Sequence, residues 1–142
     1  MKPIRVLLAE DSMAVARPLQ MLLATEFDVV CWVEDGHSLL SMARDLRPQV
    51  VVTDITMPGL DGLAAAEQLL AEGVVEYVVF ITMHDDPALV QRAMAHPHCG
   101  YVLKADAGEE LLFGMHEVLA GRPFMSASIS KRMDAEHTDS PP

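Results

Sequence analysis

Cysteine, aromatic residues and long apolar runs are all scarce in this sequence of 142 residues. It contains 2 Cys, 1 Trp, 2 Tyr and 4 Phe. The two cysteines, Cys31 and Cys99, stand far apart and form no C-x-x-C pair, which excludes a disulfide scaffold and favours buried free thiols in a reducing cytosol. No stretch has the length of a membrane-spanning helix or the pattern of a secretory leader. We therefore expect a cytoplasmic domain that binds no membrane.

Positive charge is scarce as well. The 10 Lys and Arg residues stand against 21 Asp and Glu, which gives a formal net charge of -11. A surface of this sign repels phosphate backbones, so this segment is not expected to bind nucleic acid itself and suits a divalent cation or a basic partner better. Hydrophobic residues make up 51% of the chain, which excludes a disordered protein. The length fits one folded domain.

Short apolar runs rich in valine recur along the chain and predict β-strands. They contain no strict alternation of polar and apolar residues, which indicates strands covered on both faces, as in a parallel sheet between helices. The segments between them carry apolar residues at helical spacing, such as Leu39, Ala43 and Leu46. This alternation predicts an α/β fold, doubly wound, with a five-stranded parallel sheet flanked by helices. The five runs are residues 6–8, 29–33, 50–52, 78–81 and 101–103.

The pattern weakens near the C-terminus and suggests three parts. Residues 1–122 form the predicted domain. Residues 123–133 are expected to form a short helical extension, since they could make one or two helical turns. Residues 134–142 are polar, contain two prolines and are expected to be a linker or a disordered tail.

Polar side chains follow four of the five predicted strands. Glu10 and Asp11 come after the first, Asp54 after the third, Thr82 after the fourth and Lys104 after the fifth. Because ligands of open parallel sheets bind at the carboxyl ends of the strands, we expect these side chains to converge on one rim. Taken alone, each has a plainer interpretation, such as a helix cap, a turn aspartate or a solvated lysine.

The expected convergence has a chemical consequence. Crowded carboxylates raise one another's pKa values unless a cation lies among them, and an open set of oxygen ligands suits Mg²⁺. Lys104 and Thr82 would receive anionic oxygens from the other side. This arrangement is what phosphoryl transfer requires, and without a central Ser or Cys the natural nucleophile is the Asp54 carboxylate.

These residues resemble those of a known family. The segment 50–62, VVVTDITMPGLDG, is similar to the phosphoacceptor segment of two-component response-regulator receiver domains. Glu10-Asp11, Thr82 and the segment 100–104, GYVLK, extend the resemblance in order and spacing. The segments 82–86, TMHDD, and 118–126, VLAGRPFMS, resemble the NarL/FixJ subgroup. The resemblance implies a CheY-like (flavodoxin-like) fold with strand order 2-1-3-4-5.

The resemblance also implies roles for residues at the site. Asp54 would accept a phosphoryl group from a sensor histidine kinase. Asp11 and Asp54 would ligate Mg²⁺ (or Mn²⁺) directly, with Glu10 acting directly or through water and Thr56 contributing its backbone carbonyl. The domain would not be a separate enzyme, but would catalyse its own phosphotransfer and dephosphorylation.

The remaining implied roles concern the response to phosphorylation. Lys104 would pair with the phosphoryl oxygens, the Thr82 hydroxyl would move to bond the phosphoryl group, and Tyr101 would change rotamer behind it. The receiver would then switch its output face. Further partners are a second copy in a homodimer, and DNA only through an effector domain absent from this chain. The chain would therefore be the N-terminal part of a transcriptional regulator, cut from it, or else a free-standing receiver.

Three alternative functions deserve comparison with this one. A phosphatase of the haloacid-dehalogenase kind needs a second Asp two residues after the first, where this sequence has Thr56. A flavodoxin-like flavin module needs a phosphate loop after the first strand, where Glu10-Asp11 would repel the phosphate. A phosphorylation-independent pseudo-receiver, serving as an interaction scaffold, is the remaining alternative, and the acidic residue set argues against it.

Overall fold

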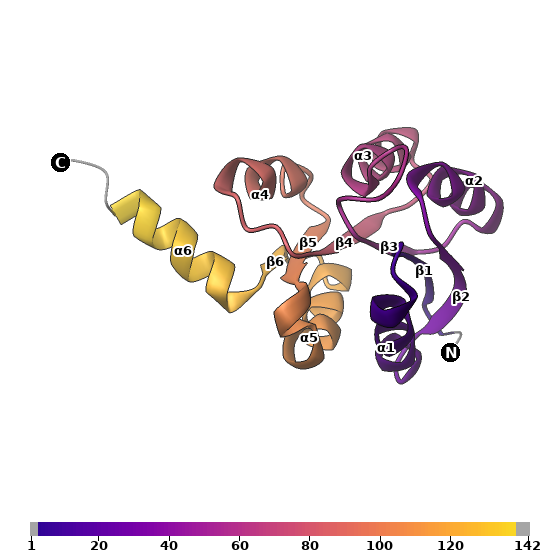
Figure 1. Ribbon diagram of the computed structural model, residues 1–142, viewed down its shortest axis with the longest axis horizontal. Helices are drawn as coiled ribbons and strands as arrows, with labels where there is room; N and C mark the ends of the chain where they lie inside the picture. The colour runs from indigo at the N-terminus through magenta and orange to yellow at the C-terminus, as the bar shows by residue number, and fades with distance from the viewer. Residues whose placement is uncertain (1–2, 139–142) are drawn as a thin grey trace.

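In this computed structural model, which describes residues 3–138, six parallel strands form one sheet with helices on both faces (Figure 1). The strand order is β2-β1-β3-β4-β5-β6. The predicted α/β class is confirmed, and so is the order 2-1-3-4-5 of the first five strands. The strands are β1 (Arg5–Ala9), β2 (Asp28–Val33), β3 (Val50–Thr53), β4 (Tyr77–Thr82), β5 (Cys99–Leu103) and β6 (Phe124–Met125).

Helices connect the strands and enclose the sheet. Figure 1 shows α2, α3 and α4 on one face, and α1 and α5 on the other. Asp35 and Asp61 cap two of these helices, because their carboxylates accept the N–H groups of Ser38 and Ala64, each at 2.7 Å. The helices are α1 (Met13–Ala24), α2 (Gly36–Leu46), α3 (Gly62–Glu72), α4 (Pro87–Ala93), α5 (Ala107–Leu119) and α6 (Ala127–Thr138), with the 3-10 turn η1 (Lys104–Asp106) before α5.

Both faces of the sheet are buried, which explains the uninterrupted apolar strands. Leu7 and Val51 pack into the cluster beneath α2, α3 and α4, whereas Val6 and Leu8 pack into the cluster beneath α1 and α5. All four side chains are fully buried. Successive residues of a strand point to opposite faces, so alternate apolar side chains serve the two clusters.

The prediction of five strands is wrong, because a sixth strand lies outside β5. Residues Phe124–Met125 pair in parallel with Gly100 and Tyr101 of β5. Two residues are too few to show as an apolar run, and this pairing depends on backbone hydrogen bonds rather than on a side-chain pattern. The segment expected as a helical extension therefore begins as a strand.

The C-terminal helix is longer than expected. It runs over Ala127–Thr138, past residue 133 where the predicted helical extension ends. The remainder of the predicted tail, residues 139–142, lies outside the described residues. None of the helices within residues 3–138 combines the length and apolar character needed to cross a lipid bilayer.

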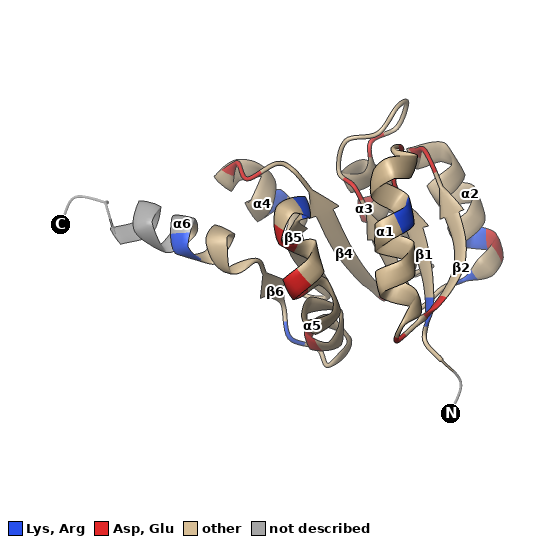
Figure 2. Ribbon diagram, turned by 60° about the horizontal axis from the view of Figure 1, so that its bottom comes forward, with Lys and Arg blue, Asp and Glu red and all other residues tan. Residues whose placement is uncertain are grey.

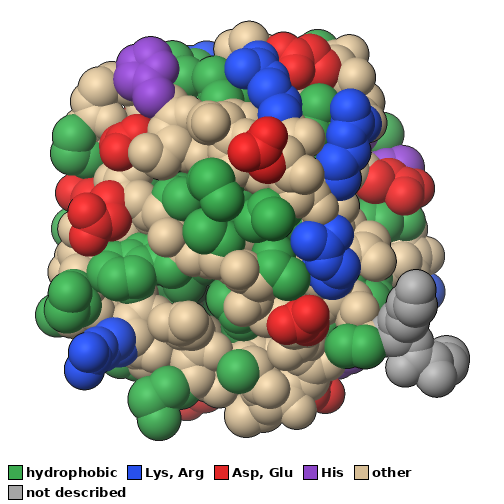
Figure 3. Space-filling view, turned by 90° about the vertical axis from the view of Figure 1, so that its right-hand side faces the viewer, with side chains coloured by type: hydrophobic (Ala, Val, Ile, Leu, Met, Phe, Trp, Pro, Cys, Tyr) green, Lys and Arg blue, Asp and Glu red, His purple; other side chains and the backbone are tan. Residues whose placement is uncertain are grey.

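The surface shows no concentration of positive charge in the views drawn. Lys and Arg positions are scattered over the ribbon rather than grouped on one element (Figure 2). Seen from the β2 side, apolar, acidic and basic side chains are intermixed (Figure 3). The expectation that this segment does not itself bind nucleic acid stays a prediction.

Candidate functional site

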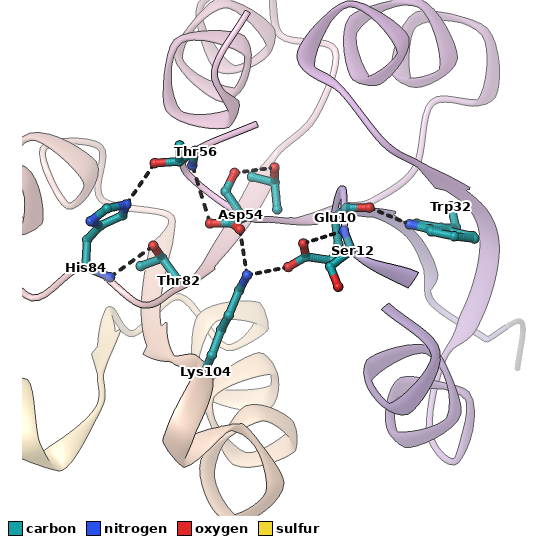
Figure 4. A network of polar contacts seen from close by, with 9 residues as sticks. Glu10, Ser12, Trp32, Asp54, Thr56, Thr82, His84 and Lys104 are labelled. Atoms are coloured by element: carbon teal, nitrogen blue, oxygen red, sulfur yellow. Dashed lines mark hydrogen bonds and ion pairs between the residues drawn. The ribbon is translucent and has the colours of Figure 1, made fainter. Parts of the chain in front are cut away.

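Three buried or half-buried charged side chains meet at the carboxyl ends of the strands (Figure 4). The Nζ atom of Lys104 lies 2.6 Å from Glu10 Oε1 and 2.7 Å from Asp54 Oδ2. The Glu10 side chain is fully buried, that of Asp54 is 8% exposed and that of Lys104 is 18% exposed. These residues lie after β1, β3 and β5, so the parallel topology brings them together as predicted.

Glu10 is held in place from several directions. Its Oε2 accepts the N–H of Ser12 at 3.0 Å, and its backbone carbonyl accepts the indole N–H of Trp32 at 2.8 Å. Its other carboxylate oxygen, Oε1, is in ion-pair contact with Lys104, but no donor among the described residues is aligned to form a hydrogen bond with it. Burial raises the pKa of Glu10 above its ordinary value, and the contacts with Lys104 and Ser12 offset only part of this effect.

Lys104 keeps its charge despite being half-buried. Burial opposes the ammonium form, but the hydrogen bond to Asp54 and the contact with Glu10 outweigh it and raise the pKa of Lys104. The ammonium therefore remains protonated and balances part of the negative charge at the site.

The acidic side chains outnumber the single ammonium. Glu10, Asp11 and Asp54 each place a carboxylate oxygen within 4.8 Å of the others. Three carboxylates with one lysine leave a formal charge of about -2, which is unfavourable without a further cation. Every donor is an oxygen and Asp11 is exposed, so the set fits Mg²⁺, which keeps water ligands, better than a soft metal.

A close contact between backbones shapes the loop that carries Asp54. A Cβ atom at Gly62 would overlap the backbone carbonyl of Asp54 and come within 2.6 Å of Thr53 Oγ1. The Thr53 hydroxyl donates to the same carbonyl at 2.8 Å, and Gly62 N–H donates to Ile55 O at 2.7 Å. The first residue of α3 must therefore be glycine for the helix to begin directly against the loop after β3.

A second network joins the loops on either side of the site. The backbone N–H of His84 donates to Thr82 Oγ1 at 3.2 Å, and the Tyr101 hydroxyl donates to the His84 carbonyl at 2.7 Å. The imidazole Nε2 of His84 lies 2.8 Å from Thr56 Oγ1. Thr82 and Tyr101 are fully buried. This network connects the loop after β3, the loop after β4 and strand β5.

The structure brings together most of the residues proposed from the sequence. Asp11 lies within the acidic cluster, and Thr56 directs its N–H towards Asp54 Oδ1 at 3.4 Å. The ligand role of the Thr56 carbonyl stays a prediction. His84 is not among the site residues proposed from the sequence, although its position two residues after Thr82 places it in the same loop.

Comparison with known proteins finds relatives that match nearly the whole of this chain. The sequence model of the family described as the response regulator receiver domain matches residues 6–114. Response regulator GacA of Pseudomonas aeruginosa is 31% identical over 132 residues, which are 92% of this chain and 62% of GacA. Transcriptional regulatory protein MctR of Rhizobium johnstonii is 29% identical over 96% of this chain and 64% of MctR. The chain thus spans less than two thirds of these relatives.

Solved structures agree with this assignment. The two-component response regulator of the LuxR family from Aurantimonas sp. SI85-9A1 has a TM-score of 0.87 and 26% identity, with 98% of this chain and all of that chain covered. The signal receiver domain of the response regulator NarL from Mycobacterium tuberculosis has a TM-score of 0.78 and 25% identity, with 86% of this chain and all of that chain covered. With the family match over residues 6–114, these likenesses show that the chain belongs to the response regulator receiver domain family.

Proposed function

We propose that Asp54 of this receiver domain accepts a phosphoryl group from a sensor histidine kinase. The observation that carries the proposal is the placement of Lys104, whose ammonium contacts both Asp54 and Glu10 in a site with an excess of negative charge. A half-buried lysine beside a carboxylate nucleophile is suited to bind the oxygens of an incoming phosphoryl group. The location expected for such a protein is the cytoplasm.

The proposed transfer needs no other nucleophile. A carboxylate oxygen of Asp54 attacks the phosphorus of a phosphohistidine in line, a P–O bond forms and the P–N bond breaks. The leaving imidazole nitrogen takes the electron pair of that bond. Lys104 then pairs with the phosphoryl oxygens, because the phosphorylated side chain carries more negative charge than the free Asp54 carboxylate.

The acidic cluster supports a divalent cation in the same reaction. Glu10, Asp11 and Asp54 would hold Mg²⁺ (or Mn²⁺), with the backbone carbonyl of Thr56 as a further ligand. A divalent cation there would offset the carboxylate charge that the single ammonium of Lys104 leaves uncompensated. When bound, the cation would neutralise charge on the transferring group. Removal of the phosphoryl group by hydrolysis would use the same residues.

The switch residues follow from the second network. The Thr82 hydroxyl would leave the His84 N–H to bond the phosphoryl group, and Tyr101 would respond through its contact with the same loop. The affected surface, formed by α4, β5 and α5, would be the output face. Binding of DNA by an effector domain joined to this receiver and formation of a homodimer are the proposed routes of output.

Intact-mass measurement after incubation with acetyl phosphate tests this proposal. We expect wild-type protein to gain one phosphoryl group in the presence of Mg²⁺ and none in EDTA. Asp54→Ala should gain none, and Asp45→Ala, which changes an exposed aspartate on α2, should behave as wild type. An unlabelled wild type would contradict the proposal and favour the phosphorylation-independent pseudo-receiver, and labelling of Asp54→Ala would show a different acceptor.

A further inference from the structure

Ser126 joins the last strand to the last helix and contacts β5 with both its backbone and its side chain. Its side chain is fully buried. Its N–H donates to the carbonyl of Tyr101 at 2.9 Å, and its hydroxyl accepts the N–H of Leu103, also at 2.9 Å. One residue of the C-terminal segment therefore holds β5 at two points on either side of residue 102.

The hydroxyl is needed because the carbonyl of Ser126 is used elsewhere. That carbonyl accepts the N–H groups of Ile129 and Ser130, both at 3.0 Å, and so forms the first turn of α6. It has turned away from β5, and the serine side chain supplies the acceptor for Leu103 instead. Ile129, which is 2% exposed, anchors the same turn, while the rest of α6 extends away from the sheet (Figure 1).

The two residues that Ser126 holds both lead to the site. Leu103 immediately precedes Lys104, whose ammonium reaches Asp54. Tyr101 donates its hydroxyl to the carbonyl of His84 in the loop after β4. If a change in the contact of Lys104 or of Tyr101 displaces β5, it must either stretch the hydrogen bonds between β5 and Ser126 or move Ser126 as well. Ser126 directly precedes α6, so a movement of Ser126 reaches that helix.

We infer that Ser126 is a positioning residue for Lys104 and a joint through which the phosphorylation site and α6 affect each other. This inference rests on the proposed function, because it takes phosphorylation of Asp54 as the event that displaces β5. Coupling of this kind is reciprocal, so a partner that binds α6 would also change the position of Lys104 and its affinity for a phosphoryl group.

The test compares Ser126→Ala and Ser126→Cys with wild type in the full chain. Cysteine keeps the shape of serine but is a weak acceptor, so it separates loss of the hydrogen bond from loss of packing. Ser128→Ala is the matched control: its exposed hydroxyl donates to Asp106 at 2.9 Å and does not contact β5. Amide exchange measured by NMR, before and after acetyl phosphate with Mg²⁺, reports on Leu103 and on α6, and intact mass reports phosphorylation.

We expect the Leu103 amide to exchange about tenfold faster or more in both Ser126 variants without phosphorylation, since a lost hydrogen bond of about 1.4 kcal/mol corresponds to that factor. Phosphorylation should change exchange in α6 by about fivefold or more in wild type and Ser128→Ala, and by less than about twofold in the Ser126 variants. The rate of phosphorylation should fall in the Ser126 variants and not in Ser128→Ala.

Other outcomes would overturn the inference. An unchanged Leu103 amide, a normal α6 response in the Ser126 variants, or no α6 response in phosphorylated wild type would each do so. If only Ser126→Ala loses the response and Ser126→Cys keeps it, packing rather than the hydrogen bond is responsible, and the inference is wrong. A wild type that gains no phosphoryl mass overturns the proposed function and the coupling with it, while the Leu103 exchange still decides the positioning contact.

Discussion

Replacing Lys104 with methionine should destabilise the folded protein in a way that Mg²⁺ reverses. The variant keeps an unbranched side chain but leaves the Glu10 and Asp54 carboxylates, 0% and 8% exposed, without their ammonium partner. Breaking a buried ion pair by removing one partner costs about 3–5 kcal/mol. Because Lys104 is itself 18% exposed, we expect a cost at or just below the lower end of this range, about 2–3 kcal/mol.

Urea denaturation in EDTA and in saturating Mg²⁺ measures this effect. With an m-value of about 2 kcal/mol/M, the expected loss lowers the midpoint by about 1–1.5 M in EDTA. Mg²⁺ binds the folded carboxylates and should stabilise the variant more than wild type, since the variant site is more negative. Arg44→Met is the control, because the Arg44–Glu72 ion pair is 43% and 36% exposed and should contribute little to stability. Equal losses in the two variants, or equal stabilisation of Lys104→Met and wild type by Mg²⁺, would refute the reasoning.

Two further predictions concern the loop after β3 and the cysteines. Gly62→Ala should destabilise the protein by about 1–3 kcal/mol or more in urea and slow the phosphorylation of Asp54, because the new Cβ displaces the loop backbone. Gly108→Ala, at an open position of α5, should instead be stabilising by about 0.5–1 kcal/mol, and a loss there would contradict the account. Burial raises the pKa of Cys99 to about 12, so at pH 8 maleimide should label folded protein at half-buried Cys31 and not at Cys99. Both thiols should react in urea, and rapid labelling of Cys99 in the folded state would disprove its burial.

The sequence was sufficient to predict the central sheet and most of the site. A valine-rich strand with no polar alternation implies that both faces are covered, and a parallel sheet places the residues after its strands on one edge. Glu10, Asp54 and Lys104 could be grouped for this reason, although they lie far apart along the chain. This grouping depends only on which residues follow the strands of a parallel sheet, and the short apolar runs locate those strands well.

Other features depend on contacts that no pattern of residue types encodes. The strand Phe124–Met125 forms because these two residues pair with the outer edge of β5. Two residues are too few to show a periodic pattern of polar and apolar side chains. His84 was visible in the sequence, but its contact with Thr56 depends on how two loops approach each other. The role of Ser126 could not be predicted either. From the sequence, a serine before a helix is expected to be an ordinary N-cap, and only the structure shows that its hydroxyl accepts the N–H of Leu103.

The cost of the acidic site and its expected affinity for a cation have one cause. Glu10 is fully buried in a cluster with more carboxylates than ammonium groups, and its raised pKa reflects free energy lost when it is ionised in the fold. A bound divalent cation or a phosphoryl group on Asp54 changes the charge balance that this burial opposes. Lys104 contacts these carboxylates and directly follows β5. A change of charge at the site therefore acts on β5, and β6, which leads into α6, is paired with that strand. The charge excess that weakens the fold is therefore also what would let the fold respond to the proposed phosphorylation of Asp54.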